Sequence, residues 1–441
     1  MNGADDPGPI DPLLPLELRA SDLERVGLGR PSVFASEFGC VAMSSFESMS
    51  ATLDPDHWGL HGGAPPDRCG GGFDRVCNGT NVMAQRNYPC DNLIQAYFVT
   101  EDGYFDAVGE AAFQRQLYHC MMGQALQMKS TIEARRSRNE YGHLLWQLNE
   151  IWPTGGWGSL EHGTPGRPGQ VPGGRWKPLH HLLRSGLFAD VLATCAGRTG
   201  LCYVRNDAAA RPFSGTVLLR SIDLATGRVD WSRRVPTGVL PPGPGSVLAF
   251  SIPPAAAGTA LDGATHFLRI EVLGGADGDG EEDGKEEMAA GTGTLVSRND
   301  LLLRPPGELQ GLPRDSGLRA RVGRPFPTPG TGIGPAGGAT AVPIEVSAAA
   351  PVALYVVLTT QAPGWFSDNA FSIVAGGTKG QPTTVLFHPF GEEVDLDLLT
   401  RTLRVEDVAM YQHPRTGEGL TNSSSSSPED ATEREARLDP Q

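Results

Sequence analysis

A carboxylate at the end of a short apolar run is the first feature of this chain that could do chemistry. In PSVFASEFGC, residues 31–40, Val33 to Ala35 lead into Ser36 and Glu37, and an aromatic residue and a glycine follow. Catalytic groups of parallel barrels stand at such strand ends. A lone Glu before a turn is also an ordinary way for a strand to end in solvent. Glu37 is therefore a candidate nucleophile or acid only if other residues join it.

The stretch LLWQLNEIWP, residues 144–153, supplies side chains that could share a site with Glu37. Its aromatic and amide residues are Trp146, Gln147, Asn149 and Trp152. If the strand predicted at 143–149 runs parallel to the strand that holds Glu37, both strand ends open on one face of the sheet. Pyranose rings pack their C–H faces against indoles, and amide side chains hydrogen-bond sugar hydroxyls. A carboxylate beside these residues therefore indicates a sugar site.

The elements around these residues alternate between strands and helices. A long helix is predicted at 108–136, because apolar residues recur at helical spacing and form one face. These residues are Phe113, Leu117, Met121, Met128 and Ile132. We interpret the methionines as core residues and not as ligands. The strand at 143–149 is largely apolar and is predicted to be buried on both faces, and a short helix is predicted at 176–188. This order is typical of a parallel α/β sheet or barrel.

From about residue 190 the pattern changes to short β-rich runs separated by Gly, Asp and Asn, which is typical of antiparallel sandwiches. We divide the chain into a polar lead at 1–30, a barrel portion at 31–190, a first β-sandwich at 191–304 with an acidic loop at 274–293, a Pro/Gly-rich linker or crossing segment at 305–340, a second β-sandwich at 341–412 and a tail at 413–441. The serine-rich, charged tail is predicted to be disordered.

Composition narrows the classes of function. The chain has 441 residues, of which 39% are hydrophobic, enough to bury several cores. The net charge of −15 argues against nucleic acid or an anionic membrane as a partner. The N-terminal sequence shows no signal peptide, and no apolar run reaches transmembrane length. We therefore expect no membrane anchor in this sequence.

Seven cysteines bear on metal and redox chemistry. None of them forms a C-x-x-C pair, so a zinc or redox site is not expected. Cys195 and Cys202 are close enough for a bridge across a hairpin, and Cys69, Cys77 and Cys90 share one loop-like stretch. Such bridges would require an oxidising compartment. The odd total leaves at least one free thiol.

Three motifs together resemble a known family. ASEFG at 35–39, followed by LLWQLNEIWPTGGWGSLEHG at 144–163 and GGRWKPLHHLLR at 173–184, is similar to the C-terminal half of β-mannosidases of glycoside hydrolase family 2. LTTQAPGWFSDNAFSIVAGG at 358–377 resembles their C-terminal immunoglobulin-like domain. The resemblance covers roughly 30–190 and 340–412. It implies an α/β plus all-β fold: the C-terminal part of a (β/α)8 TIM barrel, followed by two immunoglobulin-like β-sandwich domains.

The resemblance also implies roles for particular residues. Glu37 matches the family's nucleophile, which acts in a retaining mechanism through a glycosyl-enzyme intermediate. Trp146 matches a tryptophan that would line the sugar pocket, and the substrate-binding residues implied with it are Asn149 nearby and Trp152 at the rim. A second set, Trp152, Trp157, Glu161 and Trp176, matches positions for which we favour a structural role.

The substrate implied by the family is a terminal β-D-mannose residue on an oligosaccharide or a glycoprotein glycan. No cofactor and no metal are implied, because two carboxylates suffice for the reaction. The resemblance also implies a lysosomal or secreted location for the protein.

Three departures from the family pattern matter, and the first is the insertion HGTPGRPGQVP between Glu161 and Gly173, with an enlarged loop after Glu37. Glu150 stands where the family has Asp. The family's acid, which lies in a W-x-x-N-E motif well before the nucleophile, has no counterpart in the 36 residues that precede Glu37. The other acidic residues considered for that role are Glu47, Glu101, Glu140 and Glu150. A full barrel also needs about 250 residues. The sequence therefore reads as a fragment of a longer polypeptide.

Three other functions stay open at this point. A related family 2 activity, either exo-β-glucosaminidase or endo-β-mannosidase, would use the same nucleophile. A non-catalytic carbohydrate-binding remnant is the third, and the missing acid favours it, whereas Glu37 and the tryptophan-rich motif count against it.

Overall fold

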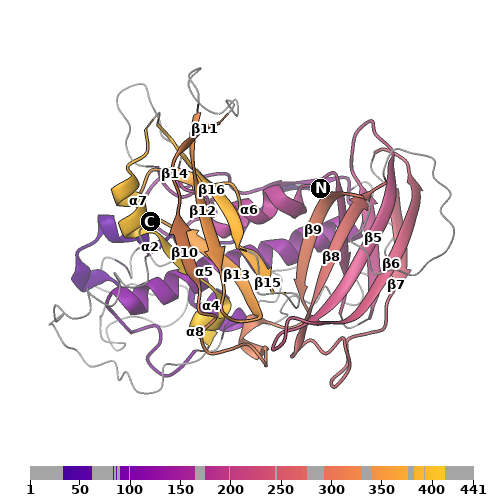
Figure 1. The fold of residues 1–441 in the computed structure, drawn as a ribbon, viewed down its shortest axis with the longest axis horizontal. Coiled ribbons are helices and arrows are strands. Elements are labelled where there is room, and N and C mark those ends of the chain that lie inside the picture. Colours follow the sequence, from indigo (N-terminus) through magenta and orange to yellow (C-terminus); the bar gives the residue numbers. More distant parts are fainter. Residues whose placement is uncertain are drawn as a thin grey trace, which may run out of the picture.

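The computed structural model describes most of the chain between residues 33 and 412 (Figure 1). The described residues are 33–61, 83, 86, 90–98, 100–163, 174–197, 199–243, 246–275, 293–328, 339–375, 382–391 and 393–412. The predicted lead at 1–30, residues 276–292 of the predicted acidic loop and the predicted tail at 413–441 lie outside these ranges. No helix of the described residues is long and apolar enough to cross a membrane.

Glu37 and the tryptophan-rich motif belong to a pair of parallel strands. Strand β1 (Phe34–Phe38) pairs with β2 (Gly142–Leu145), with Phe34 opposite Gly142 and Phe38 opposite Leu145. The strand predicted at 143–149 is thus present, although it is shorter. The prediction that it is buried on both faces is wrong, because Leu144 is 56% exposed. Within the described residues β1 is its one strand neighbour, so the larger barrel stays a prediction.

The long helix predicted at 108–136 is confirmed as α5 (Glu110–Ser137). Its predicted apolar face is buried, with Phe113 and Ile132 inaccessible to solvent. Figure 1 shows α5 extending along both β modules. Tyr118 Oη donates to the carbonyl of Tyr355, at 3.0 Å, in the second module. On the other side the hydroxyl of Tyr203, in the first module, donates to the carbonyl of Glu133. The helix therefore joins the two modules.

Shorter helices complete the block around α5. They are α2 (Phe46–Met49), the 3-10 turns η1 (Ser50–Thr52) and η2 (Pro55–His57), α4 (Cys90–Tyr97), α6 (Pro178–Leu182) and the π-helical turn η4 (Leu183–Leu187). The helix predicted at 176–188 is confirmed by α6 and η4. A disulfide joins Cys90 of α4 to Cys120 of α5, so Cys90 pairs outside the loop-like stretch that it shares with Cys69 and Cys77.

The first β module is an antiparallel sandwich of two sheets. One sheet has the order β3 (Val191–Cys195), β4 (Leu201–Asn206), β7 (Ser246–Ser251), and the other has the order β6 (Val229–Leu240), β5 (Phe213–Asp223), β8 (His266–Gly274), β9 (Thr294–Leu302). Val217 and Leu219 are two residues apart on β5 and point into one core with Leu268 and Ile270 of β8. The disulfide predicted between Cys195 and Cys202 is present across β3 and β4.

The second β module is also a sandwich. One sheet contains β10 (Arg319–Val322), β12 (Ala339–Ser347), β16 (Thr383–Pro389) and β14 (Gly364–Phe366), with β11 (Phe326–Thr328) also on β12, and the other contains β15 (Phe371–Val374), β13 (Val352–Thr359) and β17 (Arg404–Glu406). The turn η5 (Pro306–Glu308) precedes it, and α7 (Leu396–Thr402) and α8 (Val408–Gln412) lie near its end.

The segment predicted as a linker at 305–340 differs from that prediction. Residues 319–322 and 326–328 are strands β10 and β11, and both pair with β12. These strands have four and three residues, which is too short to show a periodic pattern among the surrounding prolines and glycines. The antiparallel sandwiches themselves are as predicted.

Candidate active site

The backbone brings the end of β1 against the end of β2. Trp146 N donates to the carbonyl of Phe38 at 2.8 Å, so Trp146 directly follows the paired residues. Gly39 allows this approach, because a Cβ at this position would lie 1.9 Å from Trp146 O and 2.8 Å from Trp157 Cδ1. The glycine after Glu37 and Phe38 is therefore required by close packing of the two strand ends.

Glu37 itself faces solvent. It is the fourth residue of β1, one before the end, and its side chain is exposed. The β1–β2 register is irregular between Ala35 and Phe38, the part of the strand that holds Glu37. Within the described part of the chain, no side chain forms an ion pair or hydrogen bond with its carboxylate. The carboxylate is thus available to a ligand.

The residues predicted to bind the sugar are all exposed in the segment after β2. Trp146 is 47% exposed and Trp152 is 61% exposed, and Asn149 also reaches solvent. Hydrogen bonds from Gln147 N to Trp157 O (3.2 Å) and from Glu150 N to Leu160 O (3.0 Å) hold this segment against 157–160.

Trp146 lies next to the end of the strand that carries Glu37, whereas Trp152 lies six residues further along. The loop of Trp152 is joined to Arg86, through Gly155 N and Arg86 O at 3.0 Å. Asn149 Nδ2 donates to the carbonyl of Glu150 at 3.2 Å. Of the predicted residues, the backbone hydrogen bonds therefore bring together the strand end of Glu37 and Trp146.

Two other chemically active side chains near Glu37 are neutral at physiological pH. Burial raises the pKa of the Cys40 thiol to about 12, so it stays protonated and is a poor nucleophile. His143 pairs with Ala35 across β1 and β2. Burial, and next the positive charge of Arg135, lower the pKa of His143 to about 4. His143 therefore does not supply a proton at neutral pH.

The carboxylates considered as a second catalytic acid are all held by basic side chains. The ion pairs are Glu47 with Arg404 at 2.9 Å, Glu101 with Arg115 at 2.5 Å, Glu140 with Arg135 at 2.8 Å and Glu150 with Lys177 at 2.6 Å. Each of these carboxylates is thus already bound to a cation of the protein. None of these four carboxylates stands unpaired in the described structure.

Glu161 and Trp176 make the structural contacts that their motif positions predict. Glu161 is buried and accepts hydrogen bonds from Ser45 Oγ, at 2.9 Å, and from Ser48 Oγ. Trp176 stacks on Trp365 of the second sandwich with ring centroids 4.5 Å apart. Glu161 thus holds the start of α2, and Trp176 connects the block around α5 to the second sandwich.

Lys177 is a site residue that the sequence did not predict. It holds Glu150 and also donates to Ala42 O at 3.2 Å. A lysine inside the motif GGRWKP was the available signal, but a lysine is mostly a surface residue. The structure buries it completely.

One group of residues in the described structure has the composition of a metal site. Asp223, Asp230 and His266 lie in the first sandwich with their ligand atoms within 4.8 Å of one another. His266 Nε2 is 3.2 Å from Asp230 Oδ2, and Thr226 N and Oγ1 both bond Asp223 Oδ1. These hydrogen bonds are enough to explain why the three side chains lie close together. It shares no strand with Glu37.

A family model of an Ig-fold domain, Ig_mannosidase, matches residues 335–410. The β-mannosidase of Capra hircus is 30% identical over 168 residues, which cover 36% of this chain and 16% of that protein. β-Mannosidase A of Aspergillus terreus is 26% identical over 242 residues, which cover 49% of this chain and 22% of that protein. The matched region thus spans about a fifth or less of these relatives' length.

A solved structure with a similar fold is the exo-chitosanase CsxA of Amycolatopsis orientalis. Its TM-score is 0.55 and its sequence identity is 14%, and the match covers 91% of this chain and 44% of that chain. At this identity the likeness concerns the fold. Together with the Ig-fold match and the sequence relatives, it confirms the resemblance that the motifs predict: this chain is similar to the C-terminal region of β-mannosidases of glycoside hydrolase family 2.

Proposed function

We propose that this chain is the nucleophile-bearing part of a retaining β-mannosidase. Its substrate would be a terminal, non-reducing β-D-mannose residue of an oligosaccharide or a glycoprotein glycan. The observation that carries the proposal is the junction of β1 and β2, where Gly39 lets the strand end of Glu37 meet Trp146. An exposed carboxylate and an exposed indole at adjoining strand ends can bind a sugar and attack it.

The proposed reaction has two steps. Glu37 attacks the anomeric carbon of the mannose, and the bond to the leaving-group oxygen breaks as an acid protonates that oxygen. Water then attacks the glycosyl-enzyme ester, the same acid residue accepts the proton of that water, and Glu37 is released. The sugar keeps its β configuration because both steps invert it. Trp146 packs against the ring, and Asn149 and Trp152 are proposed to contact the rest of the glycan.

The second carboxylic acid is proposed to come from outside the described residues. A retaining pair stands about 5 Å apart, and the carboxylates considered above are tied up in ion pairs. We also propose that β1 and β2 are two strands of a larger parallel barrel. The exposed apolar side chains along this pair support that idea, because such patches usually mark a surface that another element covers. They include Phe34, Tyr141, Leu144, Leu148 and Ile151.

The test is hydrolysis of p-nitrophenyl β-D-mannoside by the native, full-length protein. Glu37→Ala should abolish turnover, and added azide should restore product release as α-mannosyl azide, because azide enters the space of the lost carboxylate and inverts the anomeric carbon once. Glu345→Gln is the matched control, since Glu345 is an exposed carboxylate of the second sandwich. Unchanged turnover in Glu37→Ala would overturn the proposal. Release from the β-glucosaminide, but not from the mannoside, would assign the related activity.

A second candidate function is sugar binding without hydrolysis. It is favoured by the pairing of each carboxylate that was considered as the acid. Binding of a β-mannoside by the native protein, with no product released over a long incubation, would establish it in place of catalysis.

A further inference from the structure

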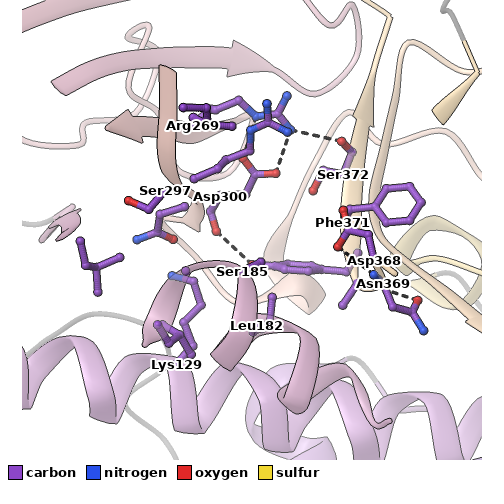
Figure 2. A pocket seen from close by; sticks show the side chains of 18 of the residues that line it. Lys129, Leu182, Ser185, Arg269, Ser297, Asp300, Asp368, Asn369, Phe371 and Ser372 are labelled. Carbon is purple, nitrogen blue, oxygen red and sulfur yellow. Dashed lines mark hydrogen bonds and ion pairs between the residues drawn. The ribbon is translucent and has the colours of Figure 1, made fainter. Parts of the chain in front are cut away.

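A cavity of about 240 Å³ lies where three parts of the molecule meet (Figure 2). Lys129 of α5 and Ser185 of η4 line one side, Ser297 and Asp300 of β9 line another, and Phe371 of β15 closes it from the second sandwich. None of its lining residues belongs to β1, β2 or the tryptophan-rich segment. The cavity is therefore separate from the site of Glu37.

The basic groups of this cavity are already neutralised. Arg269 makes a bidentate pair with Asp300, with Nε–Oδ1 at 2.7 Å and Nη2–Oδ2 at 2.8 Å. Lys129 is paired with Glu133 at 2.6 Å, and Arg298 is paired with Glu271 at 2.9 Å. A strongly anionic ligand would thus gain little from these cations, because it would have to compete with the built-in carboxylates.

The wall of the cavity includes the buried amide side chain of Asn299. Asn299 is only 6% exposed, and its amide nitrogen donates to Glu133 Oε1 at 2.7 Å and to Ala193 O at 3.2 Å. These two bonds use the amide hydrogens and fix the orientation of the group. Asn299 Oδ1 is inaccessible to solvent, so this amide is a fixed part of the wall and not a contact for a ligand.

Further groups suit hydroxyls, which both donate and accept. The Asp368 carboxylate receives the backbone N–H of Asn369, at 2.8 Å, which leaves acceptor sites open. Lys129 has three N–H donors, one of which is directed to Glu133.

Phe371, which is half-buried, adds an aromatic surface for C–H faces, whereas Tyr355 is 2% exposed. Tyr355 and Phe371 both line the cavity, and Figure 2 shows Phe371 beside Asp368 and Asn369. A polyhydroxylated ring binds where several polar groups lie next to an aromatic side chain. At about 30 Å³ for each water, the volume exceeds the space of a few waters and is in the range of one pyranose.

We propose that this cavity binds one neutral sugar unit, at a site distinct from that of Glu37. The ligand lies between the block of α5 and the two sandwiches, so its binding holds the three parts together. The proposal does not require that Glu37 is catalytic. A glycan with several sugars could occupy both sites, which would raise the affinity of the whole protein for branched substrates.

The experiment is titration calorimetry of the native, full-length protein with D-mannose, N-acetyl-D-glucosamine and D-glucose, on a Glu37→Gln background. Ser185 is an exposed lining residue, so Ser185→Trp should fill the cavity without disturbing a core, and Ser185→Ala is its matched control. We expect Ser185→Trp to weaken binding of at least one sugar by about tenfold or more, or 1.4 kcal/mol, while Ser185→Ala binds as the parent does. Equal binding by both variants, or no sugar binding at all, overturns the proposal.

Two further readouts keep the test decisive. If Ser185→Trp does not fold, sugar-dependent shifts of labelled Phe371 and Tyr355 ring resonances in the parent protein are expected, and their absence contradicts the site. Inorganic phosphate that displaces the sugar with higher affinity would show an anion site instead. Loss of hydrolysis in Glu37→Gln with unchanged sugar binding separates this site from the proposed catalytic one.

Discussion

Lys177 Nζ lies 2.6 Å from Glu150 Oε1, and solvent reaches 0% of the lysine side chain and 3% of the glutamate side chain. Glu150 Oε1 also accepts from Gly158 N at 2.9 Å, and Lys177 also donates to Ala42 O. The pair thus ties the segment after β2 to the start of α6 and to the segment after β1. Gly156 makes room for it, because a Cβ there would lie 2.1 Å from Glu150 Oε2.

We expect the buried Glu150–Lys177 ion pair to contribute strongly to the free energy of unfolding. Lys177→Met should lower the free energy of unfolding by about 3–5 kcal/mol, because it leaves a buried carboxylate without its partner. Lys177→Met combined with Glu150→Leu should recover part of that loss, since no buried charge remains. Urea unfolding followed by fluorescence measures both. The exposed pair of Arg321 and Glu345 is the control, and Arg321→Ala should cost less than about 1 kcal/mol. An equal cost for Lys177→Met and Arg321→Ala would contradict this role.

A second prediction concerns the aromatic contact between the block of α5 and the second sandwich. The rings of Trp176 and Trp365 are stacked at 4.5 Å with 15° between their planes, and Trp365 also stacks on His388 at 4.3 Å. Trp365→Ala should cost about 3–5 kcal/mol. A double-mutant cycle with Trp176→Ala should give a coupling energy of about 0.5–1.5 kcal/mol. Additive single effects would show that the contact is incidental.

Local patterns predicted much of the fold. The helix at 110–137 follows from the apolar spacing of Phe113 to Ile132, because that spacing depends only on the helix period. The hairpin bridge of Cys195 and Cys202 follows from a separation of seven residues. The strand of Glu37 follows from its apolar run and the turn after it. Each of these features is determined by residues close together in the sequence.

Features that depend on distant residues escaped prediction. The exposure of Leu144 depends on which strands cover β2, and β10 and β11 depend on β12 for their pairing. The ion pairs of Glu47 with Arg404 and of Glu150 with Lys177 join residues 357 and 27 positions apart. For the candidate site, the motif predicted Glu37 and Trp146 as neighbours. The packing role of Gly39, by contrast, depends on its contacts with Trp146 and Trp157, which lie more than 100 residues away in the sequence.

The third prediction compares the disulfides of the described residues. Cys90–Cys120 closes a longer loop than Cys195–Cys202, with separations of 30 and 7 residues. Loop entropy predicts a stabilisation of about 3.5 kcal/mol for the longer loop and about 2.5 kcal/mol for the shorter one. Replacing each pair by Ala, one pair at a time, should show this order in urea unfolding.

Cys40 is the control thiol, and at pH 8 it should resist iodoacetamide in the folded protein, since burial raises its pKa to about 12. Rapid alkylation of Cys40 would contradict that environment.

The last prediction concerns the pH dependence of stability at Asp407, which precedes α8. Its side chain is buried and accepts hydrogen bonds from Ser316 Oγ and, at 3.0 Å, from Met410 N. Burial raises the pKa of Asp407 to about 6, against about 3.9 in an unfolded chain. The unfolded chain therefore loses this proton first as the pH rises. The contribution of Asp407 to stability is complete below pH 4 and falls as the pH rises to about 6, by an amount of order 3 kcal/mol.

Asp407→Asn removes the titration but keeps an oxygen that can accept from Met410 N. Its stability relative to the parent should therefore improve between pH 4 and pH 7, and other titrating groups cancel in this difference. Urea unfolding of both proteins at several pH values measures it. Asp395→Asn is the matched control, because Asp395 also receives a helix N–H, from Leu398 at 2.8 Å, but is exposed to solvent. Its unfolding over the same pH range serves as the reference for an exposed helix-capping Asp. A constant difference between Asp407→Asn and the parent across this range would show that the Asp407 carboxyl carries no burial cost.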